Sequence, residues 1–210
     1  MALTKSTAEV DAWAEIAQAG FREGANTDVS DSYGATLHID CAIAEEAVAH
    51  TGTEVIVQIG TDTSDADDKW STLVRWIGPT GTAVGAAFAN QEAAAQTVLG
   101  ITDPATHNVD NHKKFKFINA ATEANSEIVY SLSDSGDGGD TVTIQDGLTN
   151  QQEATSVLLD FDTVATEVVA QWNVAIPLTA DRIRVLYNNN YDADGAKAMT
   201  RCRISKVTAL

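Results

Sequence analysis

The stretch that most constrains the fold is residues 53–77, in which two alternating runs flank a loop of small and acidic residues. The runs 54–59 and 70–77 are rich in β-branched and aromatic residues, and residues 60–69 connect them. Period-two alternation bounded by Gly, Asp and Ser is typical of two half-buried strands in a hairpin. In the second run, the same alternation places both of its tryptophans on one face of the strand.

Similar short segments, separated by turn residues, fill most of the chain after residue 35. They predict strands over 36–43, 113–119, 127–132, 141–145, 156–162, 167–174, 182–187 and 198–207, with a hairpin loop before the last strand. The Ala-rich stretch 90–100 is the exception and predicts a short helix. Many short strands between turns predict an all-β fold, an antiparallel β-sandwich or jelly roll over residues 36–210.

Residues 1–35 are predicted to form an N-terminal arm and not a domain of their own. Ser6 and Glu9 have capping-box spacing, and apolar residues that include Trp13 and Ile16 follow at helical intervals. A short amphipathic helix fits this pattern. An extended arm lying on a neighbouring subunit fits it equally well.

The charge of the chain argues against two classes of partner. Its 30 acidic and 13 basic residues give a formal net charge of −17, and an acidic surface repels both nucleic acid and an anionic membrane. The first residues lack the apolar core of a signal peptide, and no apolar run has the length of a transmembrane helix. We therefore expect synthesis in the cytoplasm, where Cys41 and Cys202 are predicted to be buried free thiols and a disulfide is the alternative.

No motif in the chain indicates catalysis, a cofactor or a metal. A nucleophile elbow, a phosphate-binding glycine loop and a His-Glu-x-x-His motif are all missing, and the four histidines have no zinc-type spacing. Acidic loops at 62–68, 134–140 and 192–195 carry the oxygen ligands that Ca²⁺ prefers, without EF-hand spacing. Asp and Gly are also the residues of ordinary β-turns. We therefore predict no catalytic residue, no cofactor and no metal site.

The basic residues are concentrated near the C-terminus. Residues 182–210 carry six basic and two acidic side chains, a charge of +4, whereas the other 181 residues carry −21. Arg182 and Arg184 share one strand face, and so do Arg201 and Arg203, so four guanidinium groups would crowd together if the two strands paired. Two interpretations remain open: these cations pair with the chain's own carboxylates, or they form a docking face for an acidic surface.

Three stretches carry a resemblance to a known class of proteins. They are Ala49-His-Thr-Gly-Thr-Glu-Val-Ile-Val-Gln58, Trp76-Ile-Gly-Pro-Thr-Gly-Thr82, and the closing Asp181-Arg-Ile-Arg-Val-Leu-Tyr, Tyr191-Asp-Ala-Asp-Gly and Thr200-Arg-Cys-Arg-Ile-Ser-Lys-Val207. In style, residues 36–210 resemble the β-rich decoration or cement proteins that coat the capsids of tailed bacteriophages. The resemblance implies a non-enzymatic homo-oligomer, often a trimer, that binds the major capsid protein or another virion protein on the capsid exterior.

The leading hypothesis is therefore a virion structural protein whose acidic bulk faces solvent. The residues predicted to dock on the shell or on sister subunits are Trp13, Ile16, Arg182, Arg184, Arg201 and Arg203. A carbohydrate-binding or adhesion module of a phage head or tail appendage is the alternative, because four tryptophans and an acidic loop could stack on a sugar and hold calcium. A hydrolase with a carboxylate pair has no support beyond the abundance of acids.

Overall fold

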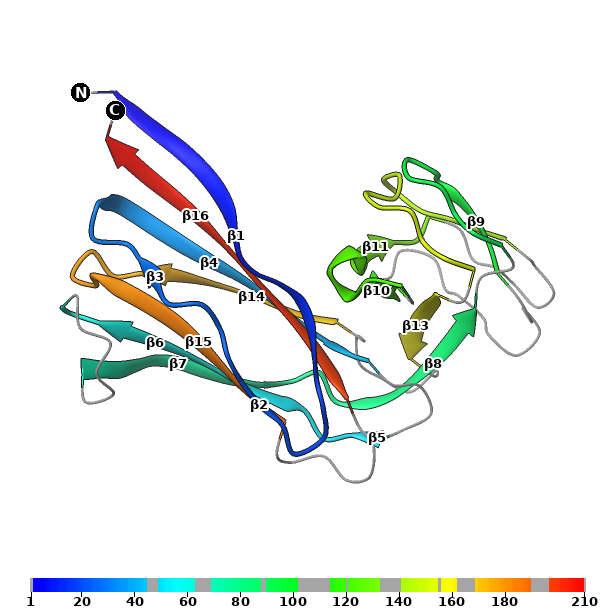
Figure 1. The fold of residues 1–210 in the computed structure, drawn as a ribbon, viewed down its shortest axis with the longest axis horizontal. Coiled ribbons are helices and arrows are strands. Elements are labelled where there is room, and N and C mark those ends of the chain that lie inside the picture. Colours follow the sequence, from blue (N-terminus) through cyan, green and yellow to red (C-terminus); the bar gives the residue numbers. More distant parts are fainter. Residues whose placement is uncertain are drawn as a thin grey trace.

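The computed structural model describes residues 2–44, 49–62, 69–87, 90–101, 114–119, 121–132, 141–154, 156–161, 169–189 and 197–209. Two sheets face each other in a sandwich, and the remaining strands form a smaller lobe beside it (Figure 1). Among the described residues, helix is limited to 3₁₀ geometry, in the turn Glu123–Asn125 and at Lys69. The all-β sandwich predicted from the alternating runs is confirmed.

The sandwich consists of two antiparallel sheets, here called sheet A and sheet B. Sheet A has the order β1 (Leu3–Ile16), β16 (Ala198–Ala209), β4 (Ser32–Ile43) and β14 (Val169–Ile176). Sheet B has the order β2 (Phe21–Glu23), β15 (Arg182–Asn188), β6 (Thr53–Gly60) and β7 (Trp70–Gly78), and β3 (Thr27–Asp28) also pairs with β15. The last two long strands therefore lie in different sheets, so the hairpin predicted between them is wrong.

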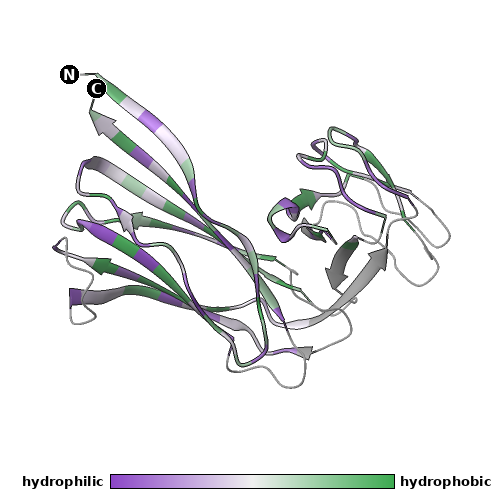
Figure 2. Cartoon of the chain, viewed as in Figure 1, coloured by the Kyte–Doolittle hydropathy of each residue, from purple (hydrophilic) through white to green (hydrophobic). Residues whose placement is uncertain are grey.

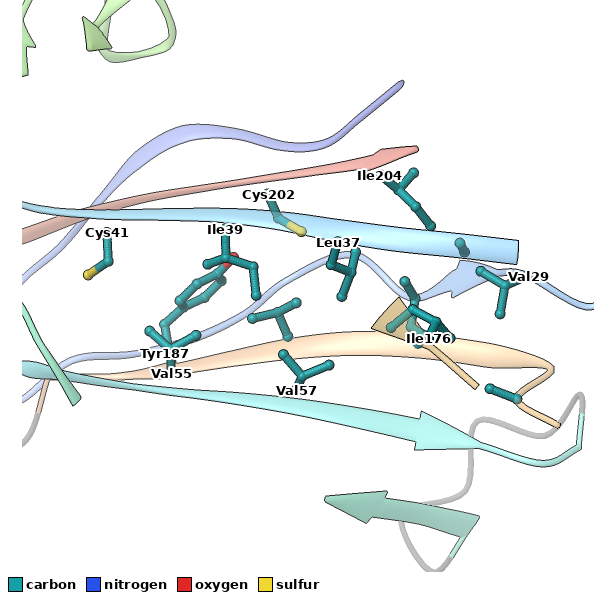
Figure 3. Close-up of a cluster of buried hydrophobic side chains, with 14 of the residues drawn as sticks. Val29, Leu37, Ile39, Cys41, Val55, Val57, Ile176, Tyr187, Cys202 and Ile204 are labelled. Carbon is teal, nitrogen blue, oxygen red and sulfur yellow. The ribbon is translucent and has the colours of Figure 1, made fainter. Parts of the chain in front are cut away.

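The main core fills the space between the two sheets, as Figure 3 shows. Along each central strand, alternate residues point inward, which is the period-two pattern of half-buried strands. Sheet A contributes Leu37, Ile39 and Cys41, and sheet B contributes Val57 and Tyr187, all of them fully buried. Figure 2 shows the matching alternation of hydrophobic and hydrophilic residues along the strands. Burial of apolar side chains is the main term that holds the two sheets together.

Apart from β5, the strands of the smaller lobe lie in the chain between β7 of sheet B and β14 of sheet A. One of its sheets has the order β11 (Glu127–Tyr130), β10 (Lys114–Ile118), β13 (Val157–Phe161), β8 (Gly81–Ala87) and β5 (Ala49–His50). A two-stranded sheet pairs β9 (Val98–Gly100) with β12 (Thr141–Thr143). The lobe has its own apolar cluster, which includes Leu99, Val142 and Ile144. That residues 36–210 form one domain stays a prediction.

The hairpin of residues 53–77 is confirmed, but the prediction that its two tryptophans share a face is wrong. Strands β6 and β7 pair with a shift, because Val57 faces Val74 whereas Gln58 faces Thr72, which leaves Leu73 as an extra residue. Such a bulge reverses the alternation. Trp76 packs against the core and stacks on Trp172, with ring centroids 5.4 Å apart. Trp70 lies instead beneath a guanidinium group on the outward face of sheet B.

The helical alternative for the N-terminal residues and the helix predicted over residues 90–100 are both wrong. Residues 3–16 form a strand of sheet A, and residues 90–100 form a turn followed by the short strand β9. In β1 the apolar residues at helical intervals lie on both faces of a strand: Ile16 enters the main core, and Trp13 packs toward the small lobe. Register shifts after Glu9 and after Asp11 place them there. That residues 1–35 act as a separable arm stays a prediction.

Candidate functional site

Trp13 lies where the small lobe meets the sandwich. Its side chain is 3% exposed and packs with Ala42, Val169 and Met199 of sheet A. Two basic side chains lie over its ring, Arg201 with Cζ at 4.8 Å and Lys116 with Nζ at 4.0 Å from the centroid. Burial, together with the nearby charge of Arg201, holds the pKa of Lys116 well below its usual range. Trp13 therefore joins the two parts of the molecule.

Asp40 of β4 forms ion pairs with Arg201 and Arg203 of β16. It is 1% exposed, and Oδ2 accepts hydrogen bonds from Arg201 Nη2 at 2.7 Å and Nε at 3.0 Å and from Arg203 Nη2 at 3.4 Å. Oδ1 accepts a hydrogen bond from Gln171 Nε2 at 2.8 Å. Removing one partner of a buried ion pair is strongly destabilising. Both arginines thus pair with one carboxylate of the chain itself, as one of the two sequence interpretations holds. A single carboxylate balances only one of the two positive charges.

Arg184 occupies the outward face of sheet B, away from β16. Its Nη1 donates to Glu23 Oε1 at 2.8 Å, its Nε donates to Gln58 Oε1 at 2.8 Å, and its guanidinium lies 4.5 Å from the centroid of Trp70. Arg182, two residues earlier on the same face, pairs in register with Asp28. Hydrogen bonds from Ser30 lower the pKa of the Asp28 carboxyl, and the charges of Lys206 and Arg182 add smaller contributions. Because β15 and β16 lie in opposite sheets, the four guanidinium groups do not gather in one cluster.

The six residues predicted to dock on a partner therefore differ in how exposed they are. Trp13 and Ile16 are buried, each 3% exposed, so neither offers surface to another molecule unless the fold opens. The side chain of Arg203 keeps 39% of its surface exposed, whereas those of Arg184 and Arg201 keep 11% and 17%. Docking by these residues stays a prediction, and of these arginines Arg203 has the most accessible side chain.

A groove of about 530 Å³ opens on the outward face of sheet A, on the part that the small lobe leaves uncovered. It runs across all four strands, and most of its lining is apolar. Two large apolar side chains border it and remain exposed, Tyr33 at 54% and Leu178 at 73%. His38, next to Arg203 in the register, lies at its inner end and bonds to Asn173 Oδ1 and Ser205 Oγ.

Sequence reasoning missed this groove. Tyr33 and Leu178 belong to segments that the sequence marks as turns, where a large apolar residue has no core to enter. An apolar side chain among Gly, Pro, Ser and Asp is a signal that could have pointed to it. Contiguous exposed apolar surface marks an interaction site more often than a scattered residue does.

The described ranges contain no group of three or more His, Cys, Asp or Glu side chains that could hold a metal ion, and no helix there is long and apolar enough to cross a membrane. Most of the three acidic loops, with His107 and His112, lies outside the described residues. His50 is buried, and its Nδ1 accepts the Gly52 N–H at 3.1 Å. Cys41 and Cys202 are buried thiols that form no disulfide, as predicted, and burial raises the pKa of the Cys202 thiol.

No protein-family model matches the chain, and no curated protein does. One similar solved structure is that of infectious bursal disease virus Gx strain, which is 7% identical over 99% of this chain and 82% of the other, with a TM-score of 0.25. Another is a VP2 subviral particle of infectious bursal disease virus, 9% identical over 100% of this chain and 80% of the other, with a TM-score of 0.19. Similarities at this level carry no argument, so function has to be inferred from the chain's own residues.

Proposed function

We propose that the chain is a non-enzymatic structural protein of a tailed-bacteriophage virion that binds the outer surface of the capsid and stabilises the shell. The observation that carries the proposal is the groove on the outward face of sheet A. It combines exposed Tyr33 and Leu178 with the cations Lys5 and Arg203 at or beside its border. An apolar centre with a polar rim is the usual composition of a protein–protein interface.

The charge distribution also supports binding with the groove face of sheet A toward the capsid. The chain carries −17 overall, but β16 and the start of β1 bring several of its basic residues to the face that holds the groove. An acidic remainder facing solvent keeps a protein soluble and repels its own copies at high density. With the groove against the shell, the cations would meet an acidic patch on the major capsid protein or on another virion protein.

The shell-binding experiment uses the full chain and particles purified without it. Wild-type protein is expected to sediment with the particles and to raise their resistance to heat or osmotic shock. Leu178→Asp places a charge in the groove and is expected to reduce the bound fraction at least about tenfold, the loss of a central interface contact. Phe21→Asp is the matched control, because Phe21 is 60% exposed on β2 of the opposite sheet.

Wild-type protein that fails to bind the particles would overturn the proposal. Equal binding by the two variants would leave shell binding standing and would exclude the groove as its site.

A carbohydrate-binding or adhesion module is supported less well. Sugar stacking needs an exposed aromatic face, and Trp13 is buried whereas Trp76 and Trp172 stack on each other within the sandwich. Trp70 is partly covered by Arg184. Binding to a glycan array that a calcium chelator abolishes would favour the module over the capsid protein.

A further inference from the structure

Strand β1 presents a long edge with no strand beside it among the described residues. From Leu3 to Glu9 it pairs with β16 without a register shift, from Leu3 opposite Ala209 to Glu9 opposite Arg203. All but one of these seven residues are exposed. In Figure 1 this part of β1 lies at the border of sheet A, at the end of the sandwich where the two termini meet. Unpaired N–H and C=O groups along such an edge are a template for another strand.

The other edges of the sandwich are less suited to pairing. Strands β2 and β3 have three and two residues, and β7 is interrupted by the bulge at Leu73. Strand β14 is regular, but its eight residues carry no charge that would select a partner or a register. The first half of β1 contains no proline and no bulge, which are common devices against edge pairing, and it carries two charges of opposite sign.

The positions of these two charges select a second copy of β1 as the partner. Lys5, Thr7 and Glu9 lie on one face of the strand, the face where Thr7 Oγ1 meets Ser205 Oγ at 3.0 Å. If two copies pair antiparallel about a two-fold axis at Thr7, Lys5 of each copy lies directly opposite Glu9 of the other. The pair occurs twice because the axis repeats it, and opposite charges at facing positions stabilise a sheet.

Neighbouring registers lose this match. An axis at Lys5 sets two lysines against each other, and an axis at Glu9 sets two glutamates against each other, both unfavourable. An axis at Ser6 places Lys5 against Thr7. An axis at Ala8 places Lys5 against Asp11, which is buried and lies beyond the first register shift of β1. Within the regular half of the strand, only the axis at Thr7 pairs both charges.

We propose that two copies of this chain associate through antiparallel pairing of residues 3–9, centred on Thr7, so that sheet A continues across the dimer. The contact is isologous, as in most dimers with a two-fold axis. It takes the place of the trimer that the resemblance to decoration proteins implies, and it does not depend on shell binding, because it is measured on the isolated chain.

Sedimentation velocity of the full chain over a range of concentrations tests the proposal. The wild type is expected to shift from monomer to dimer. Lys5→Glu replaces both ion pairs by like-charge pairs and is expected to raise the dimer dissociation constant about tenfold or more. Glu9→Lys is expected to do the same. The double variant K5E/E9K restores opposite charges and is expected to dimerise more tightly than either single variant.

Lys69→Glu is the matched control, because it makes the same charge change at an exposed residue just before β7. It should leave the dimer unchanged. Lys5 and Glu9 are exposed, so circular dichroism and melting should show that all variants stay folded. A wild type that remains monomeric, a trimer, or a dimer that K5E leaves intact would each overturn the proposal. So would a double variant no tighter than the single ones.

Discussion

At the scale of single residues, much of the polar chemistry of the sandwich is buried and structural. Asp40 is the clearest case, because one buried carboxylate accepts hydrogen bonds from Arg201, Arg203 and Gln171. Arg22 has a similar role on the inner side, where its guanidinium donates to Thr200 and lies 5.5 Å from the ring centroid of Tyr187. The Asp40 contacts join neighbouring strands of sheet A, and the Arg22 contact joins β2 of sheet B to β16 of sheet A.

The first prediction concerns Asp40. Asp40→Asn leaves two guanidinium groups without their carboxylate and is expected to lower the free energy of unfolding by about 3 kcal/mol, the cost of breaking a buried ion pair. Asp62→Asn, which removes an exposed pairing to Lys69 at 4.0 Å, is expected to cost less than about 1 kcal/mol. Urea denaturation of both variants measures the difference, and equal costs would refute the structural role of Asp40.

The second prediction concerns Cys202 and pH. Burial raises the pKa of its thiol, so the folded chain keeps a proton that the unfolded chain loses above about pH 8.5. Because the unfolded state gains by ionising, stability falls as pH rises beyond that value. Relative to Cys202→Ala, the wild type is expected to lose about 1.4 kcal/mol per pH unit above about pH 9.

Urea midpoints of the wild type and of C202A, measured from about pH 7 to about pH 10, check this. The buried Tyr187 is present in both proteins, so its contribution cancels in the difference. Two parallel curves would show that the Cys202 thiol is not protected in the folded state.

At the scale of elements, strand β7 shows how one inserted residue redistributes side chains. Leu73 is the extra residue opposite β6, and it sends Trp76 inward and Trp70 outward. The strand thus carries a core tryptophan and a surface tryptophan six residues apart. The same substitution at both positions compares how much each face contributes to stability.

The third prediction is that Trp76→Ala and Trp70→Ala differ in cost. Trp76 packs against the core and stacks on Trp172, so its truncation is expected to cost about 3–5 kcal/mol. Truncation of Trp70 removes a contact with Arg184 on the outer face, and about 1 kcal/mol is expected. Denaturant unfolding of the two variants provides the comparison. Similar losses would contradict the bulge.

The sequence predicted strands well where only one face is buried. In β4 and β15 the period-two pattern survives because polar residues alternate with Leu37, Ile39, Ile183 and Val185. It failed in β1, where both faces are covered near Trp13 and Ile16, because apolar residues on two faces of a strand imitate the spacing of a helix. The bulge in β7 was likewise invisible, since a single extra residue leaves the composition unchanged.

The candidate site was less predictable than the fold. Pairing between Asp40 and Arg201 depends on β16 lying beside β4, and the two residues are 161 positions apart in the chain. No local pattern encodes that neighbour. The groove also depends on strand pairing, because Tyr33 and Leu178 come together only when β4 and β14 pair. Sequence alone indicated that the C-terminal arginines needed acidic partners, but not which partners they have.

At the scale of the whole molecule, the sandwich and the small lobe leave one face of sheet A half covered and half open. The covered half is held by Trp13 between Arg201 and Lys116, and the open half carries the groove. The free edge of β1 borders the open half, because Lys5 also lines the groove. One end of the molecule therefore holds both of the surfaces proposed for contacts with other proteins.

The most direct test of shell binding through the groove is the density map of capsids that carry the chain, obtained by electron cryomicroscopy. If the chain binds the shell through the groove, the map is expected to show extra density on the outer surface of the shell. The sandwich should fit this density with the open half of sheet A, and Leu178 in particular, against the capsid protein. Absence of the chain from the shell, or a fit with sheet B against the capsid protein and the groove in solvent, would contradict it.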